Sequence, residues 1–478
     1  MTAVASEEGL HDHVRDSAPE FWQALIDLVK HKSTADQPDP PLCVTAETIA
    51  GLFRSVGLSS AGVTTITHGG KSSAPLVYAD ERADTDGART VLLYAHYDVQ
   101  PADESTWQVT KPFVPKEVAA GGDTRLYGRG AADDKSGVVM HLGALKALRE
   151  TWSRLPVNVK VVVEGEEESG SVLDSYLADN PGDPRFKADL VVVADTGNLA
   201  VGRPALTSTL RGILAVDVTV RTLAKEVHSG MYGGPAPDAF MVLARLLSTM
   251  HDANGDVAVP GLTRFEHDWP AVPEEQYREN AGVEPGVDLV GTGTLAQRLF
   301  GRPALNVVGL RGAPSMDRPA NVLHPEVTAR ISVRLAPNQD PDAALRAIEE
   351  HIGANAPGAV VREVEPVSLG QGFAAYRGPY HAAVETALKT AYGTGDVAHA
   401  GQGGSIPLVS ALHAANPGSD IVLWGCEEPL ANIHGDDESV SRSELERMTL
   451  AEALLLNALA EPRRTAPARG RTTTGRRT

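Results

Sequence analysis

Three short apolar runs in this sequence each lead into an acidic or imidazole side chain, and this pattern constrains the fold most. The run 91–95 precedes His96, the β-branched run 157–163 leads into several glutamates, and the run 190–194 precedes Asp195. Apolar runs of this length are typical of buried strands. Because parallel strands align their carboxyl ends, these polar groups are expected at one edge of a sheet.

Helical patterns alternate with these strands. Residues 17–30 and 44–56 place apolar side chains at helical spacing, and so do residues 138–148, which follow a glycine-rich segment. Residues 107–122 are interpreted as an irregular loop. The alternation predicts an α/β catalytic domain with a mostly parallel sheet flanked by helices.

The pattern changes after residue 207. Residues 213–220 and 329–335 alternate like half-buried antiparallel strands, and helices are expected at 237–250 and 341–352, around a long irregular stretch. After residue 370 the earlier pattern returns. We therefore expect a small α+β domain inserted into the first domain. The expected parts are the first part of the catalytic domain at 1–207, the inserted domain at 208–370, the second part of the catalytic domain at 371–461 and a disordered basic tail at 462–478.

Composition restricts the partners. The chain has 478 residues, a formal net charge of -19 and two cysteines. The negative charge argues against nucleic acid, and the few cysteines favour a reducing compartment. No apolar run approaches the roughly 20 residues of a spanning helix, and the acidic N-terminus lacks a signal core. These features predict a cytoplasmic protein that binds neither nucleic acid nor membrane.

Two histidines and several carboxylates follow the predicted strands or begin a predicted helix: His96, Asp133, the run 166–168, Asp195 and His434. So many carboxylates together repel unless a cation holds them. Imidazole and carboxylate ligands without cysteine suit Zn, Mn or Co. The supply matches a two-metal hydrolytic site with a spare glutamate as general base. The alternative for Asp133 taken alone is a helix N-cap.

Several segments resemble those of the M20 metallopeptidase family, most closely its dipeptidase, carnosinase-like branch. They include HYDVQP, GRGAADDKSG, EGEEESGS, VHSGMYGGPAPDA, SVRLAPNQ, GGSIP and NIHG. The resemblance covers nearly the whole chain except the tail. It implies two divalent metal ions per subunit, Zn or Mn with Co as a further candidate. By motif, His96 and Asp195 would bind one ion, Glu168 and His434 the other, and Asp133 both.

The resemblance also implies the catalytic groups. Glu167 would be the general base, since the Ser-Gly-Ser that follows the three glutamates aligns Glu167 and Glu168 with the family's pair. Asp98 would support His96. His228 would stabilise the oxyanion. In this family the corresponding histidine often reaches the site of the partner subunit, so the resemblance implies a homodimer in which the inserted domain is the lid and dimerisation domain.

The expected substrate contacts come from later segments. Arg334 resembles the family residue that binds the substrate carboxylate. A guanidinium suits that role, since it can make two parallel hydrogen bonds to a carboxylate. Ser405 and Gly404 would add donors, and Asn321 would help to bind the substrate. His399, which has no matched partner in the sequence, is not assigned to a site.

The predicted function is metal-dependent hydrolysis of dipeptides or short peptides. The alternatives within the family are an N-acyl amino acid deacylase and a carboxypeptidase. A non-catalytic binding protein on this scaffold is disfavoured, because all the expected ligand and base positions are filled.

Overall fold

The computed structural model describes residues 7–34, 41–152, 155–317, 319–356, 361–375 and 378–460. The basic tail expected at 462–478 lies outside them. A six-stranded sheet in the order β1-β4-β8-β5-β9-β19 forms the centre of the fold. Its last four strands are parallel, β4 pairs antiparallel with β8, and β1 pairs antiparallel with β4. The strands are β1 (Gly62–Thr64), β4 (Leu76–Glu81), β5 (Thr90–His96), β8 (Asn158–Glu164), β9 (Leu190–Val193) and β19 (Asp420–Leu423).

Helices cover both faces of this sheet. Side chains of β5 alternate between the two faces: Leu93 and Ala95 belong to one apolar cluster, and Leu92 and Tyr94 belong to the other. A parallel strand buried on both faces gives the continuous apolar run seen in the sequence. The first cluster includes α1 (Glu7–Val29), α2 (Pro41–Ser55), α3 (Lys135–Thr151), α9 (His381–Tyr392) and α11 (Arg442–Ala458), and the second includes α4 (Val172–Asp179) and α10 (Pro407–Ala415).

The segment 107–122 is not wholly irregular, contrary to the sequence-based expectation. Its end forms β6 (Lys116–Ala120), which pairs with β7 (Asp123–Tyr127) in a hairpin. Gly121 and Gly122 make the turn with φ of 58° and 92°. Two positive φ angles match the twist of a two-residue hairpin, and glycine adopts them without steric cost.

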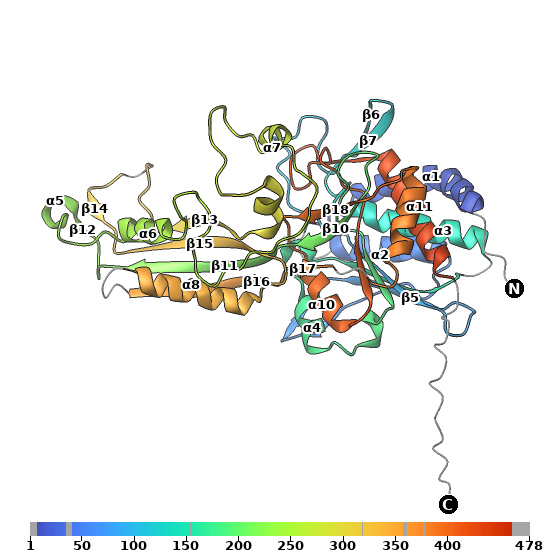
Figure 1. The fold of residues 1–478 in the computed structure, drawn as a ribbon, viewed down its shortest axis with the longest axis horizontal. Helices are drawn as coiled ribbons and strands as arrows, with labels where there is room; N and C mark the ends of the chain where they lie inside the picture. The colour runs from blue at the N-terminus through green and yellow to red at the C-terminus, as the bar shows by residue number, and fades with distance from the viewer. Residues whose placement is uncertain are drawn as a thin grey trace, which may run out of the picture.

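A second, four-stranded antiparallel sheet lies to one side of the central sheet (Figure 1). Its order is β13 (Ala304–Arg311), β15 (Glu326–Leu335), β11 (Gly212–Arg221) and β16 (Val361–Gly370). The helices α6 (Ala239–Ser248) and α8 (Pro341–Asn355) share its apolar cluster. The strand β13 was missed in the predicted irregular stretch, because a register shift interrupts its alternation between Val307 and Gly309.

Short elements complete the described chain. Residues 401 and 402 belong to a strand, β18, which pairs in parallel with β10. No helix among the described residues combines the length and apolar character needed to cross a membrane. The remaining elements are β2 (Thr67–His68), β3 (Lys71–Ser72), η1 (Glu167–Ser169), η2 (Pro184–Phe186), β10 (Ala205–Leu210), β12 (Val227–His228), α5 (Ser229–Tyr232), α7 (Glu274–Asn280), η3 (Gln297–Gly301), β14 (Val322–Leu323), β17 (Phe373–Ala374), β18 (Ala398–Gln402) and β20 (Ser439–Ser441).

Candidate metal centre

His96, Asp133 and Asp195 form one group of buried potential ligands. His96 ends β5, and its Nε2 lies 2.9 Å from Asp133 Oδ1 and 3.7 Å from Asp195 Oδ1. On the other side of the ring, Nδ1 lies 3.0 Å from the backbone oxygen of Asp98. A hydrogen on Nδ1 satisfies that carbonyl and leaves the Nε2 lone pair facing the two carboxylates.

Asp133 also belongs to a second group, with Glu168 and His434. His434 Nε2 lies 2.9 Å from Asp133 Oδ2 and 3.2 Å from Glu168 Oε1. The two oxygens of Asp133 therefore face two different histidines. His434 has a φ of 61°, in a loop between β19 and β20. The structure thus brings the five predicted ligands into two groups that share Asp133.

Asp98 positions the glutamate run. Its carboxylate accepts the backbone N–H groups of Glu167 at 3.2 Å and Glu168 at 3.0 Å. Its Oδ1 also lies 3.5 Å from His96 Nδ1. Glu166 points elsewhere, since its carboxylate accepts the N–H groups of Ala74 and Val172. These contacts agree with the motif alignment that leaves Glu166 outside the ligand pair.

Asp134, and not Asp133, is the N-cap of α3. Asp134 Oδ1 accepts the N–H of Gly137 at the start of α3, and its Oδ2 accepts the N–H of His96. The carboxylate of Asp133 is left to face the histidines. The alternative interpretation of Asp133 as the N-cap is therefore wrong.

Glu438 was missed by the sequence analysis although it organises the ligand loop. It is fully buried, and its carboxylate accepts the N–H groups of Gly130, Ala132 and Asp133. Arg129 donates to the same carboxylate at 2.7 Å. No local motif marked this role, because Glu438 is distant in sequence from the loop that it holds.

The charges of the cluster conflict unless a cation is bound. Burial, followed by repulsion from Asp195, raises the pKa of Glu167 well above its usual range. Burial also raises the pKa of Asp195 to about 6. Burial opposes ionisation of Asp133 as well, but hydrogen bonds with His434 and His96 outweigh it and lower the pKa of Asp133.

The donor set fits divalent ions. It combines two imidazole nitrogens with carboxylate oxygens, which suits Zn, Mn or Co. In the part of the chain that the structure describes, neither group contains a Lys or Arg that would neutralise its carboxylates. A divalent ion in each group would supply the missing positive charge.

The cluster opens into a cavity of about 1150 Å³ between the two large sheets. Arg334 lines it from β15 and donates to Ser405 Oγ at 3.0 Å. Gly404 also lines the cavity, together with Glu167 and Glu168. The expected carboxylate-binding residues thus share one cavity with the metal-ligand cluster.

His228 and Asn321 do not line this cavity. Both are exposed. They lie by β12 and β14, at the end of the second sheet away from the central sheet (Figure 1). The backbone oxygen of Asn321 accepts the N–H of Ser229 at 2.8 Å. Within one chain, neither residue is placed to act at the metal-ligand cluster.

Glu427 is a further cavity residue that the sequence analysis missed. It follows β19, is 6% exposed and lines the cavity beside Asp133 and Asp195. Burial, followed by the charges of those two residues, raises the pKa of Glu427 well above its usual range. Gly197 allows the close approach of this segment, because a Cβ there would lie 2.8 Å from the backbone oxygen of Glu427.

Comparison with known proteins identifies the class of protein. Residues 92–458 match the family model described as peptidase family M20/M25/M40. The chain belongs to this family, and the prediction of a metal-dependent peptide hydrolase is confirmed at that level. The match includes most of β5, the strands β8, β9 and β19 and the whole second sheet, whereas β1 and β4 precede it.

Individual relatives agree with this assignment. The chain is 34% identical over 442 residues to a cysteinylglycine-S-conjugate dipeptidase of Corynebacterium striatum, covering 91% of this chain and 94% of that protein. It is 30% identical to a human Beta-Ala-His dipeptidase, covering 70% and 68% of the two chains. The structure of human carnosine dipeptidase 1 aligns with a TM-score of 0.76 at 26% identity, covering 95% and 98%. The dipeptidase Dug1p of Saccharomyces cerevisiae shares the fold, with a TM-score of 0.80 at 21% identity, covering 96% and 99%.

Proposed function

We propose that this protein is a dinuclear metallodipeptidase that cleaves dipeptides with a free amino group and a free carboxylate. The observation that carries the proposal is that one cavity brings together groups for metal binding and groups for substrate binding. The cavity joins the two ligand groups to the Arg334–Ser405 pair and to the buried carboxylate of Glu427. This arrangement offers a charged contact to each end of a short substrate.

His96 and Asp195 would hold one ion, Glu168 and His434 the second, and Asp133 both. Bound divalent ions supply Lewis-acid chemistry and acidify water. Glu167 lines the cavity beside these ligands and binds none of the histidines. Its carboxylate is therefore placed to take a proton from water and pass it to the leaving amine.

The substrate carboxylate would bind Arg334. The guanidinium offers two parallel donors to a carboxylate, and the hydroxyl of Ser405 is already 3.0 Å from Arg334 Nη1. Gly404 adds backbone beside them in the same cavity wall. This contact favours substrates with a free C-terminal carboxylate.

The substrate amino group would bind Glu427. Across the described residues, the Glu427 carboxylate forms no ion pair with a Lys or Arg, although it is buried. An ammonium group of the substrate would offset the cost of burying that negative charge. An N-acyl amino acid has no such ammonium, so this carboxylate favours the dipeptidase over the deacylase.

The 208–370 segment would serve as the lid and dimerisation domain of a cytoplasmic homodimer. The strand β13 is an edge of its sheet and exposes Val307, Val308 and Leu310. An exposed apolar edge strand favours pairing with another chain. In such a dimer, His228 and Asn321 of one subunit would complete the cavity of the other.

A substrate panel tests this function. The purified enzyme, loaded with Mn, Zn or Co, is given Cys-Gly, S-alkylated Cys-Gly and β-Ala-His, together with N-acetyl amino acids, N-acetylated dipeptides and longer peptides. We expect hydrolysis of free dipeptides and little of the blocked compounds. Cleavage of N-acetyl amino acids alone would replace the proposal with a deacylase, and release of the last residue from long peptides with a carboxypeptidase.

The role of Glu427 is tested on the same panel. Glu427→Gln keeps the shape but removes the charge. It should raise KM for free dipeptides more than for N-acetylated dipeptides. An equal change for both would show that Glu427 does not bind the amino group.

A further inference from the structure

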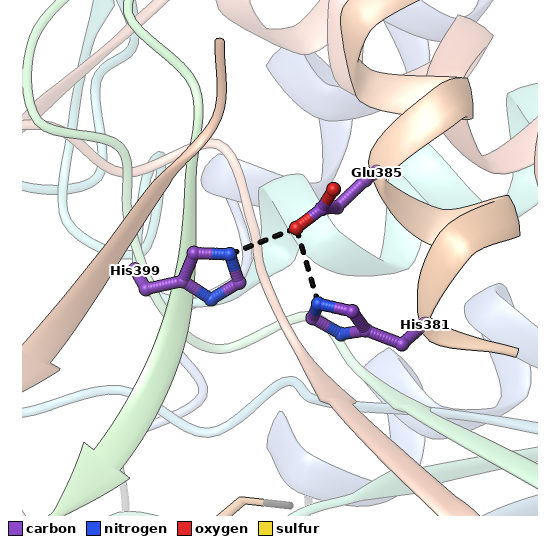
Figure 2. A group of neighbouring side chains, drawn as sticks. All are labelled: His381, Glu385 and His399. Atoms are coloured by element: carbon purple, nitrogen blue, oxygen red, sulfur yellow. Dashed lines mark hydrogen bonds and ion pairs between the residues drawn. The ribbon is translucent and has the colours of Figure 1, made fainter. Parts of the chain in front are cut away.

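A third group of potential metal ligands lies outside the catalytic cavity. His381 Nε2 and His399 Nε2 lie 3.1 Å and 2.9 Å from the same oxygen, Oε1 of Glu385. Figure 2 shows both imidazole rings turned toward this carboxylate. His399 therefore has partners, contrary to the sequence analysis, which found none.

The fold brings these residues together from two elements. His381 begins α9 and Glu385 lies four residues later, so both project from the same face of the helix. His399 lies in β18, whose pairing with β10 places it opposite Leu206. Helix periodicity thus places His381 beside Glu385, and strand pairing places His399 in β18.

A cavity of about 260 Å³ adjoins the group. His381 and His399 both line it, together with His267, Asp268 and Asp420. This cavity is distinct from the catalytic one. Asp420 begins β19, whereas Glu427 of the catalytic cavity follows the end of that strand.

The group has two histidines and one carboxylate, where each catalytic cluster has one histidine and two carboxylates, but the spacing is similar. There, histidine Nε2 atoms lie 2.9 to 3.2 Å from the nearest carboxylate oxygens. Here the two corresponding distances are 2.9 and 3.1 Å. The three ligand atoms of His381, Glu385 and His399 lie within 4.8 Å of one another, which is close enough for one ion to bind all three.

We propose that His381, Glu385 and His399 form a third divalent-metal site, separate from the catalytic pair. Two imidazoles and one carboxylate suit zinc, with a further coordination position supplied from the cavity. Lys389 competes for Glu385, but from 3.5 Å and on the other oxygen, Oε2. Oε1 therefore remains directed at the histidines.

The ion would fasten β18 to α9. β18 ends at Gln402, two residues before Gly404 and three before Ser405, which line the wall of the catalytic cavity. We therefore assign the ion a stabilising role, since none of its three ligands lines the catalytic cavity.

Counting bound zinc in the full-length protein tests the site. His399→Asn and Glu385→Gln should each lower the zinc content by about one ion per chain after dialysis. His413→Asn is the matched control, because His413 is also half-buried in the same part of the chain but lies outside the group. The control should retain the content of the unmodified protein. Equal zinc in all variants, or binding that appears only at millimolar zinc, would overturn the proposal.

A second background separates this site from the catalytic one. A His96→Asn, His434→Asn double variant should keep zinc that is lost when His399→Asn is added, whatever the number of catalytic ions. If a variant does not fold by circular dichroism, zinc-edge anomalous scattering from crystals of the unmodified protein decides. A peak between His381 Nε2 and His399 Nε2 supports the site, and its absence refutes it.

Discussion

The guanidinium of Arg129 donates to the carboxylate of Glu438 at 2.7 Å, and both side chains are buried. This pair ties two ligand segments together. Glu438 accepts the N–H of Asp133, and Arg129 donates to the backbone oxygen of His434 at 3.1 Å. The pair therefore sets where Asp133, the proposed shared ligand, and His434, the proposed loop ligand, can meet.

Glu438→Gln should weaken metal binding by about 10–100-fold, the usual effect of removing a group that orients ligands. Competition with a chelator measures this affinity. Glu452→Gln is the matched control, because Glu452 forms a buried pair with His141 away from the ligand loop. Both variants should lose stability, but only Glu438→Gln should lose metal affinity. An equal loss of affinity in both would contradict the positioning role.

Glu167→Gln should lower kcat by about 10²–10⁴-fold, the range for loss of a general base. Its metal content should stay unchanged, because Glu167 belongs to neither ligand group. Glu166→Gln is the control, since that carboxylate accepts backbone N–H groups instead. Full turnover in Glu167→Gln would show that another group is the base.

Arg334→Ala should raise KM for dipeptides by about 10–100-fold, because charge-assisted hydrogen bonds are worth roughly 1.5–3 kcal/mol. Dipeptide amides should be much less affected, because they lack the carboxylate. Arg330→Ala is the control on the same strand, where the side chain pairs with Asp217 at 2.7 Å. Steady-state kinetics on dipeptides and the matching dipeptide amides measures this difference in KM. An equal rise in KM for both substrates would exclude recognition of the carboxylate by Arg334.

His228→Ala should lower kcat strongly, although His228 does not line the cavity of its own chain. If it acts across a dimer, mixing His228→Ala with Glu167→Gln restores turnover. In the mixed dimer, one site combines an intact Glu167 with His228 of the partner chain. Activity assays after unfolding and refolding the mixture measure this recovery. No recovery from a confirmed mixed dimer would contradict action in trans.

In the unmodified protein the free energy of unfolding should fall as the pH rises, and Asp174→Asn should make this fall smaller. Burial, followed by the charge of Glu166, raises the pKa of Asp174 to about 7. The folded state then holds a proton that the unfolded state has lost, so stability falls between roughly pH 4 and pH 7 and levels off above. The variant should be more stable than the unmodified protein at pH 8, by at most about 4 kcal/mol.

Urea unfolding from pH 5 to pH 8 checks this expectation. Asp183→Asn is the control, because salt-bridging to Arg185 outweighs burial and lowers the pKa of Asp183 to about 2. Its charge is the same in both states over this range, so its effect should not depend on pH. An unchanged pH slope in Asp174→Asn would show that Asp174 is ionised in the folded protein.

The sequence predicted those helices and strands in which apolar residues recur at regular spacing. The strands β5, β8 and β9 were predicted because continuous apolar runs indicate strands buried on both faces, as Leu92 and Leu93 show. The hairpin of β6 and β7 was missed although its Gly-Gly turn was a usable signal. The edge strand β13 was missed because an exposed, irregular strand carries little apolar periodicity.

The sequence by itself determined the family, the α/β class and the candidate ligands, because these depend on local motifs and on periodicity. Only the tertiary structure decided how distant segments meet. It placed Glu438 under the Asp133 loop, Glu427 in the cavity wall and His399 against Glu385. It also placed β12, which ends at His228, at the end of the second sheet away from the central sheet (Figure 1). Such contacts depend on strand order and helix packing, which bring together residues that no local pattern relates.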